Sequence, residues 1–142
     1  MRCRTRMHPR DEGAAAVEFA LVLTLFLTLV FGIIQYSYYF FQMQATTSAA
    51  REGARIAAVG VSDCATFTNQ VKAKVTSVAP ASVGVTLAYP GGATYQSMAV
   101  VTVTVPATIF GFPFVPIPSG NIVQVAKTQV EYTVPGQVSS CP

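Results

Sequence analysis

The sequence has no tryptophan, a single histidine and few charged residues. Charged side chains make up 11% of its 142 residues, against about 25% in ordinary soluble proteins. The one histidine, His8, lies in an arginine-rich stretch, which excludes a histidine triad or a histidine metal cluster elsewhere in the chain. A net charge of +3 is too small to make a nucleic-acid-binding face, and a hydrophobic content of 51% excludes a disordered tail. These absences favour a small membrane or exported protein.

Catalytic constellations are also missing. The sequence has no glycine-rich phosphate-binding loop and no nucleophile elbow. The acidic residues beyond position 13 are too scattered to form a catalytic carboxylate pair; they are Glu18, Glu52, Asp63 and Glu131. We therefore predict no enzymatic activity, no cofactor and no metal site, and we expect a role in assembly.

A long segment without charge occupies the N-terminal third of the chain. No charged side chain occurs from Phe19 to Ala50, and residues 14–35 would form a helix about 33 Å long, enough to cross the apolar core of a bilayer. The arginines within residues 1–12 predict that this end stays in the cytoplasm while the remainder is exported. Aromatic residues at 36–41 are typical of the membrane–water interface, here on the outer face of the membrane that the helix would span. The alternative, a buried helix of a soluble domain, is disfavoured by the length of the uncharged run.

The residues around the apolar run argue against two kinds of cleaved leader. A secretory signal peptide has a short apolar core followed by a small-x-small cleavage site, whereas bulky residues follow the run here at 35–41. A lipoprotein site needs a cysteine after the apolar segment, and Cys3 precedes it. We therefore expect the spanning segment to be retained.

Glu18 is an acid at the start of this apolar segment. An unpaired carboxylate in lipid costs a few kcal/mol and by default indicates a functional site. If the chain is cut after Gly13, Ala14 supplies a free amino group four residues away on the same helix face, or on a neighbouring subunit. The alternative is a solvated glutamate at the level of the cytoplasmic headgroups.

Two sequence motifs carry a resemblance to a known family. The string Arg10-Asp11-Glu12-Gly13, followed by AAAVEF and the apolar run, resembles the class III signal of type IV pilin-like proteins. The continuation at 31–59 resembles the TadE-like minor pilins, or pseudopilins, of the tight-adherence (Tad, or Flp) pilus system, with AAREGAR at 49–55 as the most specific match. The resemblance is close over residues 10–60 and only general beyond them.

The resemblance implies a processing site and a set of partners. A prepilin peptidase would cut between Gly13 and Ala14, and Glu18 would serve assembly. The implied partners are that peptidase, other Tad pilins, the inner-membrane assembly platform and membrane lipid, with no nucleic acid. The protein would be a single-pass protein of the cytoplasmic (inner) membrane, N-terminus inside and C-terminus outside, with possible incorporation into an extracellular pilus used for surface adhesion. Two rivals stay open, an uncleaved signal-anchored envelope protein with an extracellular binding domain and a type II secretion pseudopilin.

The helix is expected to continue beyond the membrane to Val59, with Gly60 ending it. Small residues recur at four-residue spacing, which lets another backbone approach closely. They pack either on the protein's own sheet or on a partner helix. The two rows are Ala45, Ala49, Gly53 and Ala57, and Thr46, Ala50, Ala54 and Ala58.

The remainder, residues 61–142, is predicted to be a small exported α+β domain. Ser62 or Asp63 would cap a short helix that Pro80 ends. Its apolar stripe is Phe67, Val71, Val75 and Val78. Alternating patterns predict strands within 83–89, 98–105 and 122–134, the last with Ala126, Val130, Tyr132 and Val134 on its apolar face. A three-stranded antiparallel sheet cannot bury its apolar face alone, so the outer half of the long helix is its natural cover. The full division is a leader at 1–13, a membrane helix at 14–35, its exterior continuation at 36–60 and this domain.

Two further features concern the exported part. The proline-rich connection at 106–120 contains Phe110, Phe112 and Phe114, and it either covers the domain's own sheet or docks a pilus subunit or the membrane. Removal of the leader takes away Cys3 and leaves Cys64 and Cys141, which we expect to form a disulfide in an exported domain.

Overall fold

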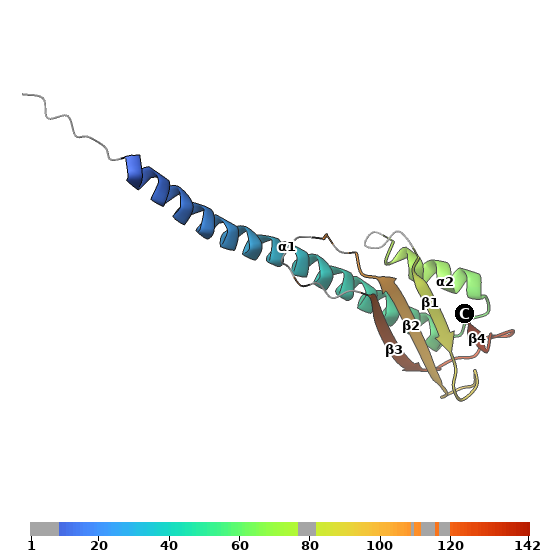
Figure 1. The fold of residues 1–142 in the computed structure, drawn as a ribbon. Coiled ribbons are helices and arrows are strands. Elements are labelled where there is room, and N and C mark those ends of the chain that lie inside the picture. Colours follow the sequence, from blue (N-terminus) through green and yellow to red (C-terminus); the bar gives the residue numbers. More distant parts are fainter. Residues whose placement is uncertain (1–8, 77–81, 109, 112–115, 117–119) are drawn as a thin grey trace, which may run out of the picture.

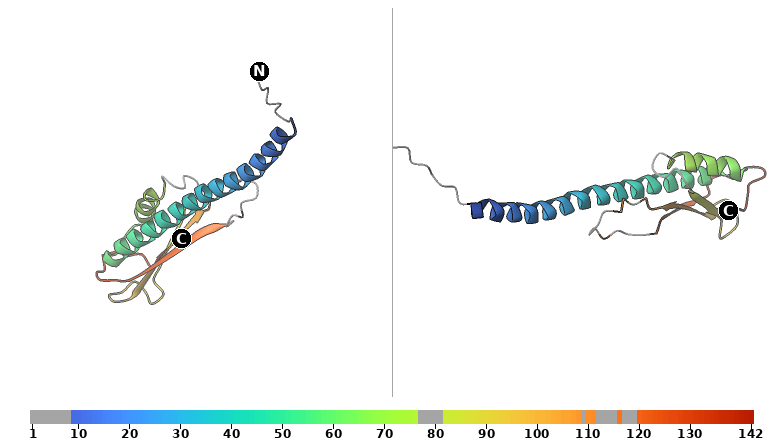
Figure 2. Two further views of the ribbon diagram at one scale, coloured as in Figure 1. Left: turned by 90° about the vertical axis from the view of Figure 1, so that its left-hand side faces the viewer. Right: turned by 45° about the horizontal axis from the view of Figure 1, so that its top comes forward.

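A computed structural model gives the fold, and it describes residues 9–76, 82–108, 110, 111, 116 and 120–142. One long helix, α1, projects from a small two-layer domain in which two helices lie on one face of an antiparallel sheet (Figures 1 and 2). The α+β class predicted from the sequence is confirmed.

Helix α1 runs from Pro9 to Val59, over 51 residues. Its sequence has no proline after the first residue, and Pro9 occupies the first helical position, where its missing N–H is not needed. The helix ends at Gly60, which has a φ of +99° and whose N–H donates to the carbonyl of Ala57 at 3.3 Å. A positive φ is accessible to glycine at little cost, so this residue is a good helix terminator.

Helix α2, Cys64–Ala73, is capped at its N-terminus by Asp63. The Asp63 carboxylate accepts hydrogen bonds from the backbone N–H groups of Ala65, at 3.2 Å, and Thr66, at 2.8 Å. Phe67 and Val71 are buried under this helix, as its apolar stripe predicts. Val78 and Pro80, also expected at this helix, lie outside the described residues.

The sheet has four strands in the order β3-β2-β1-β4, one more than predicted. They are β1 (Gly84–Ala88), β2 (Met98–Pro106), β3 (Asn121–Gln129) and β4 (Ser140–Cys141), and each neighbouring pair is antiparallel. Strand β4 escaped prediction because two residues are too short to show an alternating pattern. It pairs with β1 through Leu87 opposite Cys141 and Ala88 opposite Ser140.

The third predicted strand is too long at its C-terminal end. We expected 122–134, but β3 ends at Gln129, because the chain turns from the sheet to the end of α1. The backbone N–H groups of Glu131 and Tyr132 both donate to the carbonyl of Ala58, at 2.8 and 3.2 Å. Val130 is buried as predicted, whereas Tyr132 is 62% exposed, so its assignment to the apolar face is wrong.

The core lies between α1 and the inner face of the sheet. Val85 and Leu87 of β1 and Val101, Val103 and Val105 of β2 alternate with exposed or half-buried neighbours. Both rows of small residues on α1 face this sheet and are buried there: Thr46, Ala49, Ala50, Gly53, Ala54, Ala57 and Ala58, with Ala45 half-buried. The interpretation in which these rows pack on the protein's own sheet is therefore confirmed.

Candidate functional site

The N-terminal half of α1 is an apolar helix that projects into open space (Figure 1). Every residue from Gly13 to Leu27 is exposed, and Leu21 and Leu25 are 70% and 73% exposed. Among the described residues, α1 is the one helix long and apolar enough to cross a membrane. Large apolar side chains left uncovered along a helix of this length need a partner other than water, either lipid or other helices.

The three predicted processing and assembly residues lie at the start of this projecting half. Gly13, Ala14 and Glu18 are all exposed on α1. Ala14 and Glu18 are four residues apart, so they lie on one face of the helix with an axial separation of about 6 Å. Successive turns on one face of the helix therefore carry the proposed new terminus and the acid.

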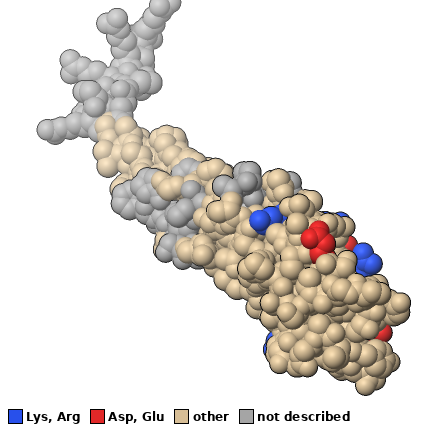
Figure 3. Space-filling model, turned by 90° about the vertical axis from the view of Figure 1, so that its right-hand side faces the viewer, with Lys and Arg blue, Asp and Glu red and all other residues tan. Residues whose placement is uncertain are grey.

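Charge is confined to the globular end on the face drawn in Figure 3. Lys, Arg, Asp and Glu atoms are visible there over the domain, while the projecting part shows none. From Gly13 to Ala50 the sequence has one charged residue, Glu18, so that acid stands alone in the part of the helix that would meet lipid.

The middle of α1 carries two buried amides that hold the connection between β2 and β3. Gln35 and Gln42 are 1% and 0% exposed. The side-chain oxygen of Gln35 accepts from the backbone N–H of Phe110 at 3.1 Å, and that of Gln42 accepts from the N–H of Thr108 at 3.2 Å. Their Nε2 atoms find no acceptor among the described residues. A buried amide is costly unless it is bonded, so these two contacts fix where this connection lies on α1.

Aromatic residues complete the same contact. The Tyr36 hydroxyl donates to the carbonyl of Pro116 at 2.9 Å, and the rings of Tyr38 and Phe110 have centroids 5.2 Å apart. Phe110, a predicted interaction residue, therefore lies beside α1 and remains 46% exposed. Phe112 and Phe114, predicted with it, lie outside the described residues.

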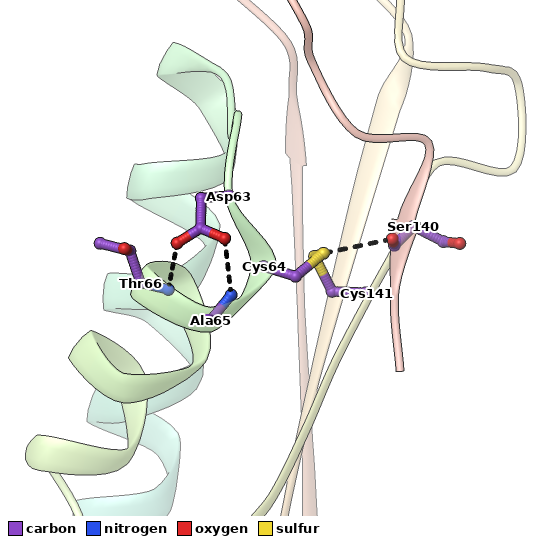
Figure 4. The surroundings of a disulfide bond; sticks show 6 residues. All are labelled: Asp63, Cys64, Ala65, Thr66, Ser140 and Cys141. Carbon is purple, nitrogen blue, oxygen red and sulfur yellow. Dashed lines mark hydrogen bonds between the residues drawn. A yellow bond between two sulfur atoms is a disulfide. The ribbon is translucent and has the colours of Figure 1, made fainter.

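The far end of the domain is held by a disulfide between Cys64 and Cys141 (Figure 4). It joins the first residue of α2 to β4, across a sequence separation of 77 residues. The Sγ atom of Cys64 also lies 3.4 Å from the carbonyl oxygen of Ser140; in a disulfide this sulfur has no proton, so the approach is a van der Waals contact. The crosslink thus fixes β4, which has only two residues in the sheet, to the helix layer.

The Asp63 cap makes the stability of this region depend on pH. Hydrogen bonds from Thr66 and Ala65 lower the pKa of the Asp63 carboxyl group below its ordinary value of 3.8. A lowered pKa in the folded state stabilises the fold above the ordinary value, and this contribution is lost as the pH falls through the lowered value.

We expect Asp63→Ala to lower the thermal unfolding temperature at neutral pH and to flatten its decline on acidification below about pH 4. Asp63→Asn is the matched control, because an asparagine caps a helix without titrating. It should keep most of the stability at neutral pH and lose the acid dependence. A wild-type pH profile in the asparagine variant would contradict this assignment.

The family model for TadE-like protein matches residues 13–55. Over this stretch the chain is similar to TadE-like proteins. No curated protein and no solved structure matches the chain at a significant level.

The TadE-like segment starts at the exposed Gly13 and ends in the AAREGAR motif. Within this motif, one face of the helix is exposed and the other is buried. In that motif Arg55 forms a bidentate ion pair with Glu52, at 2.9 and 3.0 Å, on the outside of α1. This pair lowers the pKa of Glu52. Gly53, between them in sequence, faces the core: a Cβ added there would lie 2.9 Å from Val101 and 3.1 Å from Val71. The motif therefore combines a polar outer face with a position where only hydrogen fits.

Gln35 and Gln42 are buried contact residues of the TadE-like segment that sequence reasoning missed. They are isolated amides seven residues apart, two helical turns, within an apolar and aromatic stretch. Polar residues on one face of such a helix are a signal of a buried polar contact. Their partners could not be found from sequence, because Thr108 and Phe110 follow them by 66 and 75 residues.

Proposed function

We propose that this TadE-like protein is a minor pilin of the Tad pilus system, cut after Gly13 by a prepilin peptidase and active in priming or co-assembly of the pilus. The observation that carries the proposal is the position of the Gly13–Glu18 junction at the start of an exposed apolar helix. The role is structural, and no chemical step is assigned to the chain.

The proposed arrangement in the membrane follows the sequence divisions. Residues 1–13 are a cytoplasmic leader, 14–35 span the inner membrane, 36–60 continue the helix outside, and 61–142 form the exported domain. The arginines of the leader supply the orientation. The assembly platform and other Tad pilins are the partners within the membrane.

The packing of α1 limits where neighbouring subunits can bind. The helix from Thr46 to Ala58 already has its small residues buried against the protein's own sheet. The exposed apolar half, from Gly13 onward, is free of such cover. This half is therefore the part of α1 that other pilin helices contact, in lipid and then in a fibre.

Cleavage supplies a charge partner for the acid in this half. It removes the leader and leaves a positively charged amino group on Ala14. The Glu18 carboxylate of one protomer is neutralised by the amino group of the next, which offsets the cost of a charge in lipid and sets the axial register of the helices.

Changing Glu18 to alanine tests this step. We expect normal cleavage but a fall of about tenfold or more in the protein recovered with sheared pili, since a few kcal/mol exceed a factor of ten in binding. Glu131 is an exposed acid of the domain, and Glu131→Ala should change neither the cleavage nor the amount of protein recovered with sheared pili. Normal pilus yield with Glu18→Ala would refute the pairing.

N-terminal sequencing of the protein from membranes tests the processing step and the rivals together. A start at Ala14 supports a pilin, whereas retention of Met1 would identify an uncleaved signal-anchored envelope protein. A type II secretion pseudopilin would also start at Ala14, but its removal would impair secretion instead of pili.

A further inference from the structure

The connection between β2 and β3 reaches α1 at the point where the proposed membrane segment ends. Gln35, which binds the backbone of Phe110, is the last residue of the predicted span 14–35. Tyr36, which binds Pro116, is the next residue. The two hydrogen-bonded pairs are separated by 75 and 80 residues in sequence. The connection and the helix therefore meet at one level of α1.

Exposed aromatic rings gather at this level. Tyr36 is 39% exposed, Phe40 51% and Phe41 56%, and Phe110 adds a fourth ring from the other segment. We call these four residues, together with Tyr38, the aromatic collar. The connection that supplies Phe110 contains no charged residue, since none occurs between Lys74 and Lys127.

The position of the collar along the helix determines its depth in the membrane. A helix over 14–35 is about 33 Å long and fills the hydrocarbon core, so the next two turns lie among the headgroups. Aromatic rings favour this interface because an apolar body and a polar tip are both accommodated there. Phe110 is held at the same depth because its own N–H binds Gln35 and the N–H of Thr108, two residues earlier, binds Gln42.

We propose that the aromatic collar, including Phe110, lies in the outer lipid interface, so that the exported domain rests directly on the membrane at a fixed height before assembly. This inference depends on the membrane insertion of α1 proposed above. It makes lipid the occupant of the surface around Phe110. A docked pilus subunit is the outcome that the test must separate from it.

The absence of tryptophan makes a direct depth measurement possible. Full-length variants with one tryptophan each, Phe110→Trp, Phe40→Trp, Phe26→Trp and Tyr95→Trp, would be reconstituted singly in phosphatidylcholine vesicles brominated at shallow or deep acyl positions. Phe26 lies in the middle of the predicted span. Tyr95 is 66% exposed and lies between β1 and β2, at the end of the sheet away from the β2–β3 connection.

We expect the tryptophans at 110 and 40 to be quenched alike, and more strongly by shallow than by deep bromines. The tryptophan at 26 should be quenched most by deep bromines, and that at 95 by neither. Phe40→Trp thus calibrates the interface depth on the helix itself.

Each contrary pattern has a distinct meaning. If position 26 is quenched and position 110 is not, the domain stands clear of the lipid; the inference is then overturned and the proposed insertion survives. If position 26 is not quenched, the helix is not inserted, and both proposals fail. Quenching at 95 equal to that at 110 would also overturn the inference, because the domain would then contact lipid at both ends of its sheet and not through the collar alone.

Discussion

Replacing Gly53 by valine is expected to lower the free energy of unfolding by roughly 3 kcal/mol, a large fraction of the stability of a small domain. Gly53 faces the core, where an added Cβ would lie 2.9 Å from a methyl group of Val101 and 3.1 Å from one of Val71. Both valines are fully buried, at 0% exposure, so neither can move aside into solvent. Valine would add two methyl groups beyond that Cβ.

The measurement is thermal unfolding of the full-length protein in detergent micelles, followed by near-UV circular dichroism of the tyrosines. Gly53→Ala should show a smaller loss, because the gain in helix propensity of about 1 kcal/mol partly offsets the clash. Gly32→Ala is the matched control on the same helix, since an added Cβ there meets no described atom within 4 Å. It should leave the unfolding temperature unchanged or raise it.

A compensating change tests the cause. Val101→Ala removes the nearer methyl group, so the Gly53→Ala/Val101→Ala double variant should lose less stability than the two single changes added together. Strict additivity, or a Gly53→Val protein as stable as wild type, would show that the helix and sheet are not in the close contact described.

The sequence predicts the architecture well because its strongest patterns are local. The uncharged run, the rows of small residues and the alternation in β1 and β2 each determine an element from neighbouring residues alone. The burial of the small rows on the sheet was one of two alternatives that the sequence left open, and it meets a physical need, the cover of an apolar sheet face by the long helix. The cap of Cys64–Ala73 was similarly narrowed to Ser62 or Asp63 by their place before the helix, and the structure selects Asp63.

The parts that sequence could not supply depend on contacts distant in sequence. The end of β3 at Gln129 is set by bonds from Glu131 and Tyr132 to Ala58, more than seventy residues earlier. The bonds of Gln35 and Gln42 to the β2–β3 connection are of the same kind. The processing and assembly roles of Gly13, Ala14 and Glu18 stay predictions, because an isolated chain holds neither the peptidase nor a second protomer.

Removing the disulfide is expected to lower the free energy of unfolding by about 4 kcal/mol. The crosslink closes a loop of 77 residues that contains β1, β2 and β3, so its loss returns a large conformational freedom to the unfolded chain. A domain of about 80 residues has a thin core and little stability in reserve.

The substitution should be alanine, because Cys141 is 2% exposed and a serine hydroxyl there would add its own burial cost. Cys64→Ala/Cys141→Ala and each single alanine variant should then lose similar amounts of stability in denaturant unfolding of the full-length protein. Cys3→Ala, the matched control, should lose none. Equal stability of wild type with and without a reductant, or two free thiols in the exported protein by mass analysis, would contradict the pairing.

In the variant without the disulfide, local unfolding should begin at one edge of the sheet. Strand β4 has two residues and is attached by its ladder to β1 and by the crosslink to α2. Without the crosslink, two residues of ladder cannot hold the segment, so the amides of β4 and of its partner β1 should exchange with solvent before those of β2 and β3. Val101 and Val103 of β2 are fully buried under α1, and their backbone amides should stay protected from exchange until global unfolding. Uniform loss of protection over all four strands would instead mean that the crosslink acts on the whole domain at once.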